Sequence, residues 1–214
     1  MKTYYVWGLL AAAFIMSCGR LSEKAQDAKN TVNVLQNVDD ISRNMEEGAK
    51  TAEKKMQERR QRGDTVAMHY DKLKAYMPTD LQGFTLDGDP KGEVMKNAGF
   101  SYSTITQNYK KGNSTLKVTL TDYNGVGMLY TAAFGMFGVG GLEIENDQEM
   151  VKGWDTKISE VKGFEKFRKK EKNASATVGS VERFMLNVEA SEQENTETVK
   201  AVAKSANWGE LSKM

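Results

Sequence analysis

The spacing of apolar residues changes at Pro78, and this change constrains the fold more than any other feature of the sequence. Before it, from Leu21 to about Arg62, apolar or small residues recur every three or four positions with no proline between them. That spacing is the period of an α-helix. After it, stretches such as 114–123 alternate apolar and polar residues, which is the period of a β-strand. The sequence therefore predicts a helical N-terminal part followed by a sheet-forming part.

The helical stretch predicts an arm of about 60 Å, at 1.5 Å per residue. Its apolar stripe follows a heptad with a phase shift near Val38, and Gly63 is the expected C-terminal stop. The four bulkiest members of the stripe form the predicted seam: Val32, Leu35, Ile41 and Met45. We interpret the arm as a stalk, or as a seam for self-association or for a partner helix. A helix packed on its own domain is the alternative.

The sheet-forming part predicts an antiparallel sheet with one solvated face. "FSYSTITQNY" and "STLKVTLTDY" flank the glycine-containing loop "KKGN", as in a hairpin. Leu116, Val118 and Leu120 then point to one side of their strand and the residues between them to the other. Further strands are expected at "TKISEV", "EKFRKKEK", "ASATVGSV" and "ERFMLNVEAS".

Two longer helices are expected to pack on this sheet, after a short one over 65–77. The first, 126–139, is apolar enough to be buried all round. The second, 195–207, has one buried face, formed by Val199, Val202, Ala203 and Ala206. The predicted fold class is α+β: a long N-terminal helical arm followed by an antiparallel sheet with two packed helices. The alternation of strands and helices suggests two similar halves.

The N-terminus has the features of a secretion signal. A basic residue, Lys2, precedes an apolar run from Tyr4 to Met16, which is too short for a membrane-spanning helix. The segment Ile15–Cys18 resembles the lipobox of bacterial lipoproteins and contains the single cysteine of the chain. The resemblance implies cleavage before Cys18 and attachment of lipid (diacylglycerol and an acyl chain such as palmitate) to that residue. The expected domains are a signal peptide (1–17), a lipid anchor with the arm (18–63) and an α+β domain (64–214).

The resemblance also implies a location. In some Gram-negative bacteria an acidic run after the cysteine directs lipoproteins to the cell surface, and "GRLSEKAQ" does not resemble that run. We therefore expect attachment at the periplasmic face of the outer membrane rather than at the cell surface. The globular part is similar to a group of bacterial envelope lipoproteins. The similar segments are "YMPTDLQGF", "STLKVTLTDYNG", "VERFMLNVEA" and "NWGELSKM".

Charge and residue counts exclude several classes of function. A net charge of +1 gives no field that would attract nucleic acid. One cysteine and one histidine, His69, cannot form the usual zinc sites, and no cofactor is expected. His69 is expected at a helix surface. "FRKKEK" (167–172) is expected to be a solvated strand or hairpin edge.

Two candidate sites remain. Small glycines beside four apolar residues could leave a groove for an apolar ligand: Tyr130, Phe134, Met136 and Phe137. Carboxylates of Asp87, Asp89 and Asp122 could support a periplasmic hydrolase, which is the alternative hypothesis. The leading hypothesis is a lipid-anchored, non-enzymatic envelope protein that binds a protein partner or a small apolar ligand in the periplasm.

Overall fold

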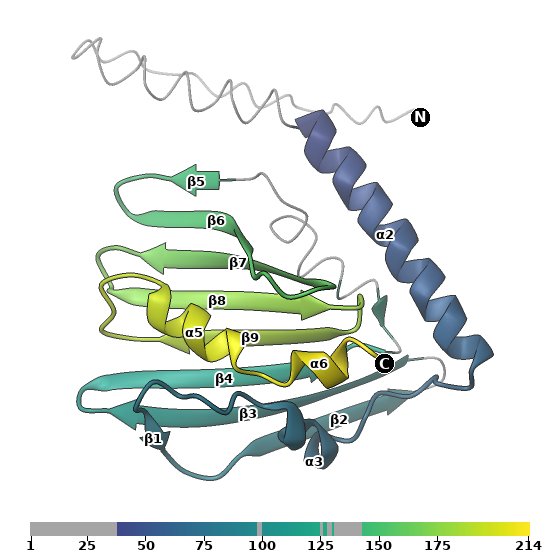
Figure 1. Cartoon of the computed structure of the whole chain (residues 1–214), viewed down its shortest axis with the longest axis horizontal. Coiled ribbons are helices and arrows are strands. Elements are labelled where there is room, and N and C mark those ends of the chain that lie inside the picture. The colour runs from purple at the N-terminus through teal and green to yellow at the C-terminus, as the bar shows by residue number, and fades with distance from the viewer. Residues whose placement is uncertain (1–37, 98–99, 125, 128–129, 131–142) are drawn as a thin grey trace, which may run out of the picture. The chain divides into compact units, whose positions relative to one another are not determined.

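The computed structural model describes residues 38–97, 100–124, 126–127, 130 and 143–214 (Figure 1). The chain divides into two units, Met1–Val38 and Asp39–Met214, and the second unit contains all the contacts discussed below. No helix in the described part is both long and apolar enough to serve as a membrane span.

A nine-stranded antiparallel sheet dominates the second unit (Figure 1). Its order is β1-β3-β4-β9-β8-β7-β6-β5, and β2 pairs with β3 beside β1. The strands are β1 (Thr85–Leu86), β2 (Lys91–Asn97), β3 (Phe100–Lys111), β4 (Ser114–Asp122), β5 (Glu143–Glu145), β6 (Glu149–Asp155), β7 (Val161–Arg168), β8 (Asn173–Ser180) and β9 (Phe184–Ala190). The sheet ends in β5 on one side and in β1 and β2 on the other.

The centre of the sheet follows the alternation of its sequence. β3 and β4 form the predicted hairpin, with a tight turn at Gly112 (φ 58°), and β4 pairs with β9. Leu116, Val118 and Leu120 are buried while Lys117 between them is exposed. β9 alternates in the same way, so the two strands present a continuous apolar face.

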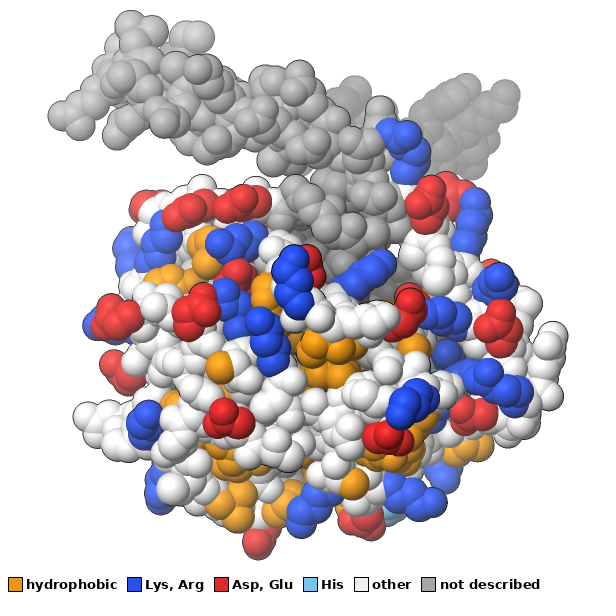
Figure 2. Space-filling view, in the orientation of Figure 1, with side chains coloured by type: hydrophobic (Ala, Val, Ile, Leu, Met, Phe, Trp, Pro, Cys, Tyr) orange, Lys and Arg blue, Asp and Glu red, His pale blue; other side chains and the backbone are white. Residues whose placement is uncertain are grey.

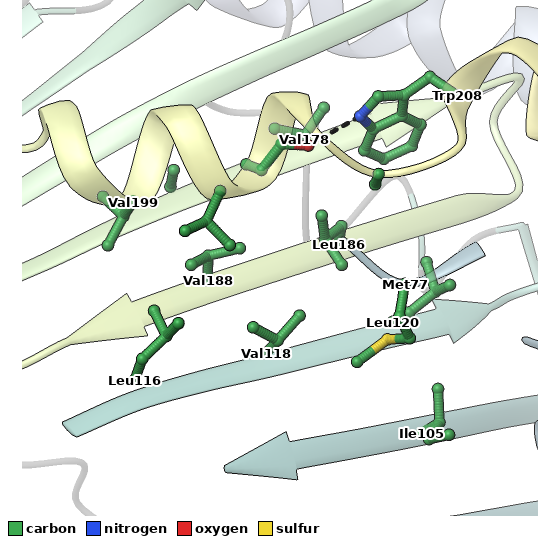
Figure 3. Packing of buried hydrophobic residues seen from close by; sticks show 14 of the residues in the cluster. Met77, Ile105, Leu116, Val118, Leu120, Val178, Leu186, Val188, Val199 and Trp208 are labelled. Carbon is green, nitrogen blue, oxygen red and sulfur yellow. Dashed lines mark hydrogen bonds between the residues drawn. The ribbon is translucent and has the colours of Figure 1, made fainter. Parts of the chain in front are cut away.

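Short helices cover that apolar face. α5 (Glu197–Lys204) lies over β8 and β9, and α3 (Tyr70–Leu73) with the 3₁₀ turn η1 (Lys74–Tyr76) lies over β2 to β4 (Figure 1). Buried side chains of α5 meet those of β4 and β9 (Figure 3). The indole of Trp208, which begins α6 (Trp208–Leu211), donates to the carbonyl of Ala203 at 2.9 Å. That bond fixes the end of α5 against the sheet.

The longest described helix, α2 (Val38–Gln61), is the first element of the described chain. Its residues Ala52, Lys55, Met56 and Arg59 are buried or half-buried, whereas its other faces are mostly exposed. These positions are spaced three and four apart, so a single stripe of the helix faces the domain. Part of the predicted stripe therefore makes contacts within the chain itself.

The predicted fold class is wrong. The described chain is mostly antiparallel sheet, its helices apart from α2 are short, and no long helical arm is seen. Helical structure is described only from Val38 onward, and the last turns of α2 are attached to the domain. In these last turns, the residues Lys55 and Arg59 of the helical stripe contact Asn124 and the loops at the ends of the strands. A coiled coil is not supported.

The sequence also predicts too few strands, because it does not predict β1, β2, β5 and β6. β2 is exposed at every residue except Val94, so it lacks the alternation that marks a half-buried strand. "TKISEV" is mainly the turn between β6 and β7 rather than a strand. The final helix is confirmed as α5, and the segment 65–77 is helical only from Tyr70. Most of the predicted helix 126–139 lies outside the described residues.

Candidate functional site

A buried cluster of charged and amide side chains lies where β4 ends and β9 begins. We call it the ionic cluster; its members are Lys55, Arg59, Asp64, Asp122, Asn124, Glu182 and Arg183. Asp122 and Asn124 end the β4 region, and Arg183 directly precedes β9. Because β4 and β9 are paired neighbours, the fold brings these residues together from distant parts of the sequence.

Asp122 is the centre of the cluster. Its carboxylate is fully buried and accepts two hydrogen bonds from Arg183, at 2.9 and 2.8 Å. It also accepts from the backbone N–H groups of Asn124 (2.9 Å) and Met68 (2.8 Å). Four donors match the acceptor capacity of an ionised carboxylate. All acceptor sites of the Asp122 carboxylate are therefore occupied by hydrogen bonds within the protein.

Arg183 is held just as firmly. Besides Asp122, it donates to Asp64 Oδ2 at 2.6 Å, and its guanidinium lies 4.6 Å from the ring centroid of Phe184. Burial lowers the pKa of Arg183, but its hydrogen bonds and the charges of Asp122 and Asp64 outweigh burial and raise it. The guanidinium is thus fixed as a cation between two carboxylates.

The cluster extends to α2 through two basic residues. Arg59, 2% exposed, donates from Nε to Asn124 Oδ1 (2.8 Å) and from Nη1 to the carbonyl of Val181 (3.2 Å). Lys55 pairs with Glu182 at 2.9 Å and with Glu160 at 3.1 Å. Burial and the nearby charge of Arg183 lower the pKa of Arg59. These contacts attach the last turns of α2 to the domain.

The turn that receives α2 has an unusual backbone. Val181 (φ 49°) and Glu182 (φ 50°) connect β8 to β9, and both residues are left-handed. Ser180 pairs with Phe184, so the loop has three residues; left-handed positions in such a turn favour asparagine or glycine, and a β-branched residue there is strained. Both left-handed residues contact α2, so the contacts with Arg59 and Lys55 help to hold the strained conformation.

The three acids of the hydrolase hypothesis do not converge. Asp87 and Asp89 are exposed beside β1, and Asp87 pairs with Lys110 at 3.2 Å. Leu86 of β1 lies level with Leu116, whereas Asp122 is six residues further along β4. At about 3.4 Å per residue this separation is about 20 Å. The carboxylate of Asp122 is moreover paired with Arg183.

Several residues of the predicted anchor, seam and groove lie outside the described chain. Cys18, Val32 and Leu35 do so, as do Phe134, Met136 and Phe137. Ile41 and Met45 belong to α2, and their side chains lie outside the described part of the structure. Tyr130 is buried, and burial raises the pKa of its hydroxyl above the ordinary range. The predicted groove and seam therefore stay predictions.

His69 and the basic run 167–172 have ordinary surroundings. His69 is exposed, precedes α3 and accepts at Nδ1 from the Asp71 N–H at 3.4 Å. The basic run lies at the hairpin between β7 and β8. No group of three potential metal ligands occurs among the residues that the structure describes.

The large exposed apolar residues of the described chain lie on the β1 and β2 side of the sheet but do not form one patch, because Leu86 is level with Tyr109 and Met95 with Tyr102, about 24 Å apart along β3. Three large hydrophobic side chains are exposed: Val66 (48%), Leu86 (60%) and Met95 (44%). Leu86 and Met95 belong to β1 and β2. Val66 precedes Ala67, whose N–H donates to Ser101, opposite Lys96 of β2. Figure 2 shows hydrophobic side chains at the surface in the lower part of the view, where β1 to β3 lie in Figure 1.

Sequence reasoning missed both the ionic cluster and the β2 edge. Arg59, Asp64 and Arg183 occur in charged stretches that resemble any solvated surface, and only the fold brings them together. Comparison with protein families, with curated proteins and with solved structures finds no match to this chain.

Proposed function

We propose that this protein is a lipid-anchored, non-enzymatic protein of the cell envelope that binds a protein partner. In this proposal Cys18 carries the lipid and the domain lies on the periplasmic side of the outer membrane. The observation that supports partner binding is the edge of the sheet at β2. It is a seven-residue strand, exposed at six of its residues, and one of them is the large apolar residue Met95.

The two edges of the sheet differ in a way that supports this proposal. β5 has only three residues, and Glu145 within it is paired with Lys169 at 2.9 Å. A very short edge strand is one way in which proteins prevent unwanted strand pairing. β2 is more than twice as long, and Met95 exposes 44% of its surface there. An exposed edge with apolar side chains is a common feature of protein-binding surfaces.

The hydrolase alternative has less support from the geometry. Paired carboxylates that share acid–base work must face one substrate, and glycosidase pairs lie within about 10 Å of each other. Asp87 and Asp122 lie at opposite ends of β4, and Asp122 is bound to Arg183. We therefore retain the binding hypothesis alone.

Site-specific crosslinking tests the binding proposal. A photoreactive residue at Met95 should capture a defined protein when the full chain is expressed in its own membranes. The same residue at Lys162, exposed on β7, is the matched control. Capture of the same products from both positions, or of none from Met95, would contradict partner binding at this edge.

The anchor is tested separately. Cys18→Ala should abolish incorporation of labelled palmitate and leave an uncleaved precursor or a soluble form. A variant that fractionates with membranes and matures like the wild type would rule out the lipoprotein assignment. Protease added to intact cells should leave the protein undigested, and ready digestion would place it on the cell surface.

A further inference from the structure

Strand β2 is held rigidly from one side. Tyr70 of α3 packs directly over Gly92: a Cβ added at Gly92 would lie 2.1 Å from the Tyr70 ring. Leu73, in the same helix, is fully buried in the core. β3 pairs with all seven residues of β2 on its inner edge. The strand is therefore preformed, and a ligand that binds its outer edge has little ordering cost to overcome.

The outer edge of β2 has free backbone groups. In an antiparallel pair, every second residue directs its N–H and C=O away from the neighbouring strand. No other described strand pairs with β2, and no backbone hydrogen bond to the outer edge of residues 91–96 occurs among the described residues. Seven residues extend over about 23 Å. This length is enough for a strand of ordinary size to be added.

The side chains at this edge define the charge of a matching ligand. Lys91 and Lys96 are exposed at the two ends of β2, and neither has an ion-pair partner in the described chain. The one acid of the strand, Glu93, accepts a hydrogen bond from the Tyr102 hydroxyl at 2.9 Å. Met95 adds an exposed apolar side chain next to Lys96; by the alternation of the strand it lies on the same face of the sheet as Lys91, and Lys96 lies on the opposite face. The edge therefore complements a strand with one acidic residue for each lysine, on opposite faces, and an apolar residue near Met95.

We propose that the β2 edge binds an extended, acidic segment of a partner protein, which pairs with β2 as an additional strand of the sheet. This inference rests on the proposed function and specifies the chemistry of the partner. Backbone hydrogen bonds supply the pairing, and Lys91 and Lys96 select an acidic sequence. Pairing of β2 with β2 of a second copy is disfavoured, because four lysines would then lie in one two-stranded ribbon.

A synthetic peptide tests this chemistry directly. The probe is an acetylated, amidated nine-residue peptide of valine and threonine with glutamates at positions 2 and 7, so that one glutamate can face each lysine, labelled for fluorescence anisotropy. It is added to the full lipidated chain in detergent. We expect the peptide to slow hydrogen exchange of the amides in 91–97. Lys91→Glu with Lys96→Glu should weaken its binding about tenfold, since two attractions become repulsions. The matched control, Lys117→Glu with Lys162→Glu, should bind like the wild type.

Several results would overturn the inference. One is equal affinity of the acidic peptide for the wild type and for the Lys91→Glu, Lys96→Glu variant. Another is protection of amides elsewhere but not in 91–97. A third is protection of 91–97 when the protein alone is concentrated, which would make a second copy the occupant.

The two proposals can fail independently. If crosslinking at Met95 captures a partner and the Lys91→Glu, Lys96→Glu variant captures it equally well, partner binding stands and the acidic strand is wrong. If the acidic peptide protects β2 but no protein is captured in membranes, the edge chemistry stands and the proposed function is wrong.

Discussion

Arg183 and Asp122, 61 residues apart in the sequence, form a buried ion pair with two hydrogen bonds of 2.9 and 2.8 Å. The side chain of Asp122 is not exposed at all and that of Arg183 is 4% exposed. The pair joins the end of β4 to the start of β9, at the centre of the nine-stranded sheet. A backbone hydrogen bond links the same two segments, because the Tyr123 N–H donates to the Arg183 carbonyl at 2.8 Å.

Asp122→Ala should therefore destabilise the domain strongly. Removing one partner of a buried pair costs up to about 3–5 kcal/mol, and here Arg183 would keep only the partly exposed Asp64 as an ion-pair partner. The Met68 and Asn124 N–H groups would also lose their acceptor. The free energy of unfolding, measured with urea, should fall by this amount.

Asp87→Ala is the control for this prediction. It breaks an ion pair with Lys110 in which both side chains are about half exposed. Such pairs contribute less than about 1 kcal/mol. Equal losses of stability in the two variants would show that Asp122 is not the centre of a buried cluster.

The comparison of sequence and structure shows which features short-range patterns can predict. Alternation at Leu116, Val118 and Leu120 predicts β4 correctly, because each residue's burial follows from the pleat of its own strand. The partner of Arg183 is instead set by which strands are neighbours. No spacing along the chain encodes that neighbourhood, so the ionic cluster could not be predicted.

The helical arm illustrates a second limit. A stripe of small and apolar residues shows that a helix has a buried face, but it does not identify the surface that buries it. Ala52 is buried and fits a heptad seam, yet Lys55 and Arg59 on the same stripe contact the chain's own domain. Arg59 continues the stripe as a charged residue. Its partner, Asn124, lies 65 residues further along the chain, so the spacing of the stripe does not predict this contact.

Arg59→Ala should release the last turns of α2 without unfolding the sheet. The change removes hydrogen bonds from a charged group to Asn124 and to the Val181 carbonyl. Bonds of this kind contribute about 1.5–3 kcal/mol each. Amide protection in 52–61 should fall at least tenfold, while protection in β4 and β9 should change little. Arg60→Ala, at an exposed neighbouring position, should leave both unchanged. Loss of protection throughout the sheet would show that α2 is an integral part of the core.

The attachment of α2 should also weaken at alkaline pH. Burial lowers the pKa of Lys55, but Glu182 and Glu160 outweigh it and raise the pKa above its ordinary value of 10.5. Because the folded-state pKa is the higher one, the stabilisation is complete below 10.5. It is lost as the pH rises through the folded-state value.

Hydrogen exchange of α2, corrected for its intrinsic pH dependence, measures this effect. Protection in 52–61 should decline above about pH 10.5 in the wild type. Lys55→Met should already weaken protection at neutral pH and remove the alkaline step. Lys54→Met, at the exposed neighbouring position, should keep the step. A step that persists in Lys55→Met would assign it to another titrating group.

Gly92→Ala tests whether α3 holds the β2 edge in place. A Cβ at this position would lie 2.1 Å from Tyr70, and the aromatic ring cannot move without disturbing the packing of α3. Overpacking of this kind costs about 1–3 kcal/mol. Gly209→Ala is the matched control, since a Cβ there meets no atom within 4 Å and the residue lies in α6. That substitution should stabilise the protein by about 0.5–1 kcal/mol, because alanine is favoured over glycine in a helix. Thermal unfolding should therefore shift in opposite directions in the two variants. Amide protection in 91–97 should fall in Gly92→Ala alone. If both variants keep wild-type stability and β2 protection, Tyr70 does not support the strand, and the edge is not the preformed template that strand addition requires.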